Sequence, residues 1–136
     1  MSMSALGMAE EFRGQVAFNC LWPRTAIATA AIDLLAGDLG RKASRTVDIM
    51  SDTAHWILTQ DKAVTGNTFV DETICLEQLG MTEADLEKYR VSTMVPLMPD
   101  FYVGDAGELE KYIDAARKMQ GAAKAAGEFT KKFGFG

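Results

Sequence analysis

The sequence predicts an α/β fold in which two parallel strands are joined and flanked by helices, followed by a helical tail. Residues 16–22 form a nearly continuous apolar run, which is typical of a strand buried on both faces of a parallel sheet. Segments with helical spacing of apolar residues separate this run from a second short strand at 67–71. Two parallel strands connected through helices are the smallest piece of a doubly wound sheet.

The first twelve residues predict a helix, because several of their apolar side chains recur at helical spacing. This helix is expected to end near Arg13 and Gly14, since a basic residue followed by glycine is typical of a helix C-terminus. No capping residue marks its beginning. We therefore expect it to be the remainder of a longer helix.

The first strand is expected to end at Pro23, because proline lacks the N–H group that a central strand needs. Residues 25–35 then predict a helix that closes at Gly37, and the polar, basic residues 39–45 predict a loop. In α/β proteins, the turn between a strand and the following helix is a common place for a bound ligand. The sequence therefore predicts a site close to Pro23.

Residues 46–59 predict an amphipathic helix, with Thr46 as its N-cap and Asp48 in the first turn, where a negative charge suits the helix dipole. The only histidine, His55, lies on this helix without a second ligand or a nucleophile nearby in the sequence. We expect it to be a surface residue. A short helix is expected over 73–79, after the second strand.

The stretch "MTEADLEKYRV" predicts another helix, in which Thr82 and Asp85 form a capping box. Residues 92–103 include two prolines and predict an extended surface segment. A long helix is expected over 107–132, with its far end weakened by two glycines.

The chain of 136 residues is long enough for one domain. Two strands are nevertheless too few for a free-standing α/β domain, because both faces and both edges of the sheet need cover. We therefore expect residues 1–103 to form a partial domain and residues 104–136 to form a helical tail.

Composition excludes several classes of function. The net charge of −5 and the absence of a basic stripe argue against nucleic-acid binding, and repulsion from anionic lipid argues against a membrane surface. No apolar run approaches the roughly 20 residues that span a bilayer, and no secretory signal begins the sequence. Cys20 and Cys75 are too few and too far apart for a disulfide framework or a metal site, so we expect free buried thiols in a cytoplasmic protein.

Two longer stretches, "MAEEFRGQVAFNCLWPRTAIATAAIDLL" and "RTVDIMSDTAHWILTQDKAVTGNTFVDE", resemble the C-terminal half of the short-chain dehydrogenase/reductase family in its hydroxysteroid-dehydrogenase-like branch. In that family a strand ends in Asn-x-x-x-Pro-Gly, and a following hydrophobic residue and Thr hold the nicotinamide carboxamide. The resemblance covers about residues 1–103. It implies the C-terminal portion of a doubly wound Rossmann-type fold.

The resemblance assigns five residues to the cofactor. Asn19 and Pro23 match the family in spacing, Ile27 and Thr29 supply the hydrophobic residue and the Thr, and Arg24 replaces the usual Gly. One extra residue separates Pro23 from Ile27 in comparison with the family. Other interpretations stay open from the residues themselves. Asn19 is equally consistent with a turn residue, Ile27 with a core residue, and Arg24 with a solvated rim residue or a contact to a 2′-phosphate or a carboxylate substrate.

The residues that the family uses for chemistry are not in this sequence. It contains neither Gly-x-Gly-x-x-Gly, which binds the dinucleotide pyrophosphate, nor Tyr-x-x-x-Lys, which serves acid–base catalysis. The resemblance places the Lys about three positions before Met1. The first hypothesis is therefore a fragment of an NAD- or NADP-dependent oxidoreductase, with no catalytic residue, no bound cofactor and no activity by itself. A small-molecule substrate is expected only if the N-terminal half is supplied.

The second hypothesis is a non-enzymatic interaction module derived from that family. Loss of the nucleotide-binding half would expose apolar faces on the first strand and on the helix over 46–59. Exposed apolar faces drive self-association. If the chain folds by itself, the sequence predicts a homo-oligomer.

Overall fold

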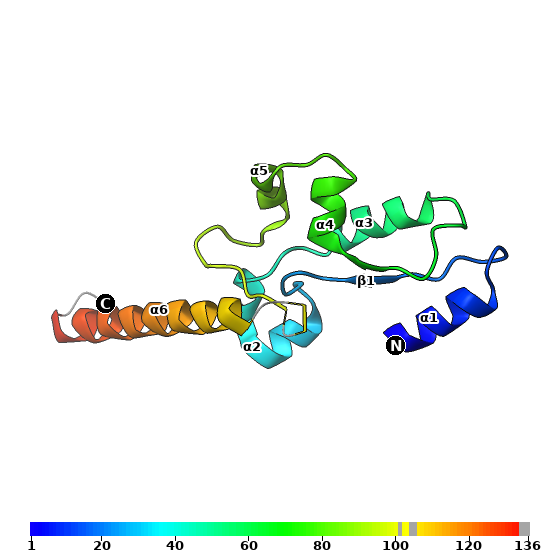
Figure 1. Cartoon of the computed structure of the whole chain (residues 1–136). Coiled ribbons are helices and arrows are strands. Elements are labelled where there is room, and N and C mark those ends of the chain that lie inside the picture. The colour runs from blue at the N-terminus through cyan, green and yellow to red at the C-terminus, as the bar shows by residue number, and fades with distance from the viewer. Residues whose placement is uncertain (101, 104–105, 134–136) are drawn as a thin grey trace.

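The computed structural model describes residues 1–100, 102–103 and 106–133, with the side chains of the last helix described at 107–119 and 121. The elements follow one another in the order α1 (Ser2–Glu11), β1 (Cys20–Trp22), α2 (Ala30–Lys42), α3 (Asp48–Leu58), β2 (Thr68–Val70), α4 (Asp71–Glu77), α5 (Glu83–Leu86), the 3₁₀ turn η1 (Glu87–Tyr89) and α6 (Ala106–Phe133) (Figure 1).

β1 and β2 pair in parallel, with Cys20 opposite Thr68, Leu21 opposite Phe69 and Trp22 opposite Val70. α1 and α2 lie on one side of the strands, and α3, α4 and α5 lie on the other side (Figure 1). This arrangement confirms the predicted α/β architecture of two parallel strands with flanking helices and a further helix, α6. The predicted boundary between domain and tail falls at residues 104–105, which lie outside the described residues.

The first strand is shorter than the apolar run predicted. Residues 16–19 have no strand partner, because the neighbouring segment here is the loop that leads into β2. Phe18 is held by that loop: its N–H donates to Thr65 Oγ1 at 2.9 Å, and its carbonyl accepts from the Gly66 N–H at 2.8 Å. Gly66 has a φ of 75°, which glycine adopts without strain.

The predicted helix over 25–35 is wrong in its first half. Residues 25–29 are extended, since two segments distant in sequence pair with their backbone: the Ala26 N–H donates to Met98 O and the Ala28 N–H donates to Arg45 O, each at 2.8 Å. Helix α2 begins only at Ala30 and runs to Lys42, so the loop predicted over 39–45 is also wrong for residues 39–42.

Gly37 lies inside α2 at a φ of 58°. Its dihedral angles are not helical and two helical pieces meet at a kink there, so the first piece ends at Gly37 as predicted and the second continues to Lys42.

The other helices lie close to their predicted positions. Thr46 does not cap α3: its hydroxyl donates to Asp48 Oδ2 at 3.0 Å, and Val47 is the N-cap residue. The capping box of Thr82 and Asp85 is confirmed, with both reciprocal hydrogen bonds present. The helix that it starts lasts one turn and continues as η1.

The core consists of two small clusters. One is formed by Ala26, Ala43, Val95 and Met98, and the other by Ile49, Cys75, Leu86 and Tyr89. Because Val95 and Met98 are buried, the prediction that residues 92–103 form a surface segment is wrong for these two residues. Two separate small clusters provide less apolar burial than a single continuous core.

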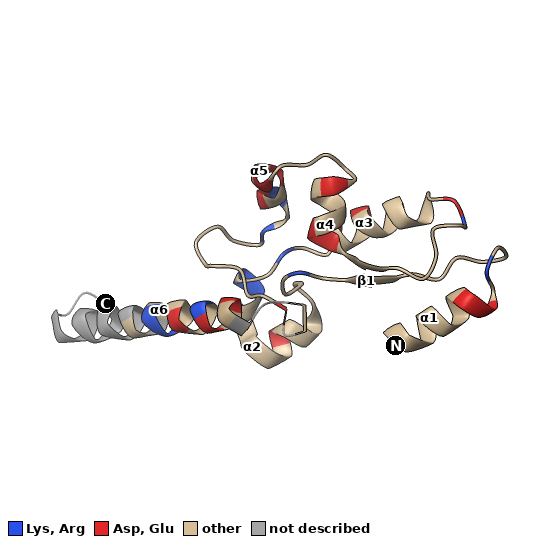
Figure 2. Cartoon of the chain, in the orientation of Figure 1, with Lys and Arg blue, Asp and Glu red and all other residues tan. Residues whose placement is uncertain are grey.

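The surface of the described residues carries charges of both signs. Lys, Arg, Asp and Glu interleave along α6, while β1 and β2 carry none of them (Figure 2). Cys20 is half-buried, Cys75 is buried, and both are free thiols. Among the described residues, no helix combines the length and the apolar character required to cross a membrane.

Replacing Ile49 by Ala should lower the free energy of unfolding by about 2–4 kcal/mol, because Ile49 is fully buried and the lost methyl groups leave a cavity. Leu58→Ala on the same helix is the matched control, since Leu58 is 83% exposed. It should change stability by less than about 0.5 kcal/mol. Urea denaturation measures both values, and equal losses in the two variants would contradict the assigned core.

Candidate functional site at the carboxyl ends of the strands

β1 and β2 end at the same edge of the sheet, because they run in parallel. Pro23 and the extended residues 24–29 follow β1, and Asp71 follows β2 as the first residue of α4. In open α/β sheets, ligands bind outside the carboxyl ends of the strands. This edge is therefore the candidate site.

Asp71 joins the two strand ends. Its Oδ1 accepts the backbone N–H of Arg24 at 2.8 Å and the N–H of Glu72 at 2.7 Å. The residue is completely buried, and its Oδ2 has no hydrogen-bond partner in the described part of the chain. Burial raises the pKa of this carboxyl above its ordinary value of 3.8, against the opposing effect of the two N–H donors. This buried carboxyl group thus ties the turn after β1 to the beginning of α4.

A hollow of about 180 Å³ opens beside this turn. Three of the five residues that the sequence predicted for a cofactor, Pro23, Ile27 and Thr29, line it together. The remaining wall consists of Ala26, Ala31, Ile32, Met98, Pro99 and Asp100. The structure therefore brings the three residues to one place although residues 25–29 are not helical.

The backbone of this segment leaves hydrogen-bond donors free. The N–H groups of Ala26 and Ala28 are paired, whereas those of Ile27 and Thr29 donate to no group in the described part of the chain. The Thr29 hydroxyl makes no capping hydrogen bond to α2. These groups fit a carboxamide, which carries both acceptors and donors. The hollow is smaller than the roughly 300 Å³ at which ligand pockets begin, so it fits only one end of a dinucleotide.

Asn19 lies before β1, at the opposite end of the strand from Pro23. Its Nδ2 donates to Val64 O at 2.7 Å, and its Oδ1 accepts from the backbone N–H and the Nδ2 of Asn67 at 3.0 and 3.1 Å. Its amide thus ties β1 to the loop before β2. The structure does not bring Asn19 to the hollow that Pro23, Ile27 and Thr29 share.

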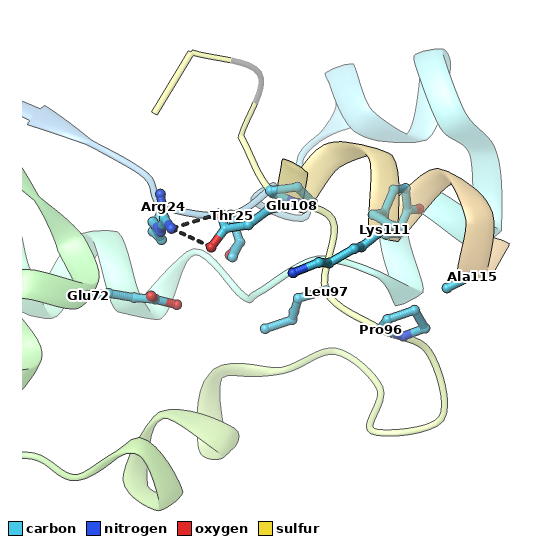
Figure 3. Close-up of a pocket in the computed structure, with 10 residues that line it drawn as sticks. Arg24, Thr25, Glu72, Pro96, Leu97, Glu108, Lys111 and Ala115 are labelled. Atoms are coloured by element: carbon cyan, nitrogen blue, oxygen red, sulfur yellow. Dashed lines mark hydrogen bonds and ion pairs between the residues drawn. The ribbon is translucent and has the colours of Figure 1, made fainter. Parts of the chain in front are cut away.

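Arg24 points away from that hollow and toward α6. Its guanidinium donates to Val103 O at 2.7 Å and to both carboxylate oxygens of Glu108 at 2.8 Å each (Figure 3). A bidentate pair of this kind fixes direction as well as distance. Arg24 therefore connects the turn after β1 to the beginning of the last helix.

Three polar residues that sequence reasoning did not assign to the site, Arg45, Asp71 and Glu72, lie beside it. Arg45 is 4% exposed, donates to Leu86 O at 2.7 Å and forms an ion pair with Glu72. Asp71 is the residue described above. The position of Asp71 and Glu72 directly after a strand is the signal that could have marked them. Arg45 gave no such signal, because its role depends on contacts distant in sequence.

No protein-family model matches the chain. It is 46% identical over 125 residues to hydroxysteroid dehydrogenase-like protein 2 of Xenopus laevis, which covers 92% of this chain and 28% of the relative. A solved short-chain dehydrogenase from Mycobacterium thermoresistibile is 37% identical with a TM-score of 0.64, covering 79% of this chain and 39% of its own. The crystal structure of a proposed dehydrogenase from Xanthomonas campestris is 43% identical in sequence, with a TM-score of 0.67. The match covers 77% of this chain and 38% of the Xanthomonas chain.

The chain spans less than a third of the length of the curated relatives that it matches. The alignment with the Xenopus laevis protein leaves only eleven residues of this chain outside it, since it covers 125 of 136. It must therefore extend well beyond residue 103, into α6. The last helix belongs at least in part to the region that is shared with these relatives.

The raised pKa of Asp71 predicts a pH dependence of stability. The folded protein holds the Asp71 proton to a higher pH than the unfolded chain does, so the free energy of unfolding should fall as pH rises from 3.8 through the raised value. Asp71→Asn keeps an acceptor oxygen but removes the titration. Its stability relative to the wild type should increase over this pH interval and level off above it.

Urea denaturation of both proteins at a series of pH values measures this difference. Thr93→Ala, at an exposed and non-titrating position, is the control for the effect of a substitution as such. Parallel stability curves for Asp71→Asn and the wild type would contradict the prediction.

Proposed function

Because the chain corresponds to the C-terminal part of a short-chain dehydrogenase/reductase of the hydroxysteroid dehydrogenase-like branch, we propose that it forms the nicotinamide-side wall of an NAD(P)-dependent oxidoreductase. The observation that carries the proposal is the common hollow of Pro23, Ile27 and Thr29 at the carboxyl edge of the strands. The complete protein would transfer a hydride between the nicotinamide and a carbonyl or alcohol. The carbonyl carbon gains the hydride and its oxygen gains a proton in the reducing direction.

Each residue of the wall has a distinct task in this proposal. Pro23 fixes the backbone where β1 ends, because its ring restricts φ. Ile27 provides an apolar surface for a ring, and Thr29 provides a hydroxyl that can donate to or accept from a carboxamide. Asp71 is a positioning residue, since it holds the Arg24 N–H and hence the turn that carries the other three.

We propose that this chain alone does not turn over a substrate. Its sequence has no Gly-x-Gly-x-x-Gly turn to bind the pyrophosphate. It also has no Tyr-x-x-x-Lys motif to exchange a proton with the reacting oxygen. A hollow of about 180 Å³ also leaves most of a dinucleotide in solvent. In this proposal, the rest of the cofactor site would lie in a region that this chain does not include, since the chain spans only 28% of the Xenopus laevis relative.

Joining the chain to the preceding part of the Xenopus laevis relative tests the proposal. Titration of NADH and NADPH, followed by their fluorescence, should show binding to the joined protein and none to the 136-residue chain. Thr29→Ala in the joined protein should weaken binding about tenfold, the effect of one lost hydrogen bond to the ligand. Thr93→Ala, at an exposed position outside the hollow, should leave it unchanged. Tight binding by the chain alone, or an unaffected Thr29→Ala variant, would contradict the proposal.

The second candidate is the interaction module, and exposed leucines favour it. Leu34 and Leu35 on α2 are 86% and 79% exposed, although neighbouring large apolar residues are usually buried together. Contiguous exposed apolar area marks contact sites. We propose that α2 contacts a second copy of the chain, which makes the chain a homo-oligomer.

Light scattering coupled to size exclusion should then give at least a dimer for the wild-type chain. Replacing Leu34 and Leu35 together by Ser should produce a monomer, because the apolar contact is removed. Met94→Ser is the matched control, because Met94 is 83% exposed and lies outside α2, β1 and α3, and it should not change the mass. A monomeric wild type would exclude this candidate.

A further inference from the structure

A second and larger hollow, which we term the Lys111 pocket, lies between the turn after β1, the beginning of α4, the proline-containing segment and the first turns of α6 (Figure 3). Its volume is about 510 Å³, within the range of roughly 300–1,000 Å³ that is typical of small-molecule sites. It is lined by Arg24, Thr25, Glu72, Pro96, Leu97, Pro99, Glu108, Lys111, Tyr112 and Ala115.

The charges of the Lys111 pocket leave one cation uncompensated. Glu108 is paired with Arg24, and Glu72 is paired with Arg45. Lys111 has no ion pair or hydrogen bond within the described part of the chain. Figure 3 shows its ammonium group reaching from α6 toward Thr25 and Leu97. The pocket therefore presents a free positive charge next to carboxylates that are already neutralised.

Three residues in the pocket lining or in contact with it each carry a buried polar atom that has no partner in the described part of the chain. These atoms are Thr25 Oγ1, Arg45 Nε and Asp71 Oδ2, and each residue is at least nine-tenths buried. Thr25 lines the pocket, Arg45 pairs with the lining residue Glu72, and Asp71 accepts from the lining residue Arg24. Buried polar groups in proteins are normally hydrogen-bonded, so the unpaired Thr25 Oγ1 in the pocket lining indicates a position where a polar ligand group would be stabilised.

Apolar side chains line the rest of the pocket: Pro96, Leu97 and Pro99 come from the proline-containing segment, and Ala115 lies one turn after Lys111 on α6. We propose that the Lys111 pocket binds a small carboxylic acid, with its carboxylate at Lys111 and its apolar body against these side chains. A carboxylate accepts from an ammonium group and from a hydroxyl, and the unpaired Thr25 hydroxyl in the lining is such a donor. Among the residues that line the pocket, an amine would find no unpaired carboxylate, since Glu72 and Glu108 are both paired and Asp71 does not line it.

This site is separate from the hollow of Pro23, Ile27 and Thr29, although both contact Pro99. The proposal does not rest on the nicotinamide function, and it can be tested without a dinucleotide.

Hexanoate is the probe, and its binding to the ¹⁵N-labelled 136-residue chain is followed by amide chemical shifts. Hexanoate should shift the resonances of Leu97, Lys111 and Ala115 in a saturable way. Hexanamide, with the same length but no charge, should bind about tenfold more weakly, the value of one charge-assisted hydrogen bond. Hexylamine and inorganic phosphate should not saturate these shifts, because one has the wrong charge and the other has no apolar body.

Two variants locate the site. Lys111→Gln should weaken hexanoate binding about tenfold, whereas Lys118→Gln, an exposed lysine on the same helix and outside the pocket lining, should not change it. Ala115→Leu should block the pocket by filling its apolar end, and its amide spectrum reports whether the fold is kept. Equal affinity for hexanoate and hexanamide, equal binding by the wild type and a folded Lys111→Gln variant, or shifts confined to another surface would overturn the proposal.

Discussion

The buried carboxyl group of Asp71 holds the ends of both strands at one point. One oxygen accepts from Arg24, in the turn after β1, and from Glu72, at the beginning of α4. A buried acceptor without a hydrogen bond destabilises the folded state, and here two N–H groups donate to the same oxygen. The turn that it fixes separates two hollows. Pro23, Ile27 and Thr29 lie beside one of them, and Arg24 and Thr25 lie beside the other. Without this carboxyl group, the backbone N–H of Arg24, at the turn between the two hollows, loses its hydrogen bond.

Arg24 extends the same constraint to the last helix. Its backbone N–H is bound by Asp71, and its guanidinium is bound by Glu108 on α6. A helix that sequence reasoning separated as a tail is therefore linked to the turn after β1, and the alignment with a curated relative also reaches into this helix. Arg24, which by the resemblance replaces the family's usual glycine, thus links the turn after β1 to α6.

Patterns within short stretches of sequence predicted the features that depend on residues close together in the chain. The parallel strands, helix α3 and the capping box of Thr82 and Asp85 follow from short-range periodicity and capping chemistry. Residues 25–29 were predicted as helix because their Thr, Ala and Ile suit one, but Met98 and Arg45 pair with their backbone across more than fifteen residues of sequence. For the candidate site, the resemblance named Pro23, Ile27 and Thr29, which line one hollow in the structure. It could not identify Arg45, or the direction of Arg24, since both are decided by contacts with α4 and α6.

The central claim is that this chain carries one wall of a nicotinamide site. A crystal structure of the chain joined to the preceding part of the Xenopus laevis relative, with NADH bound, tests it most directly. The account predicts the carboxamide within hydrogen-bond distance, about 3 Å, of the Thr29 hydroxyl or the backbone N–H groups of Ile27 and Thr29. A nicotinamide ring placed elsewhere, with no atom of its carboxamide within about 3.5 Å of these groups, would contradict it.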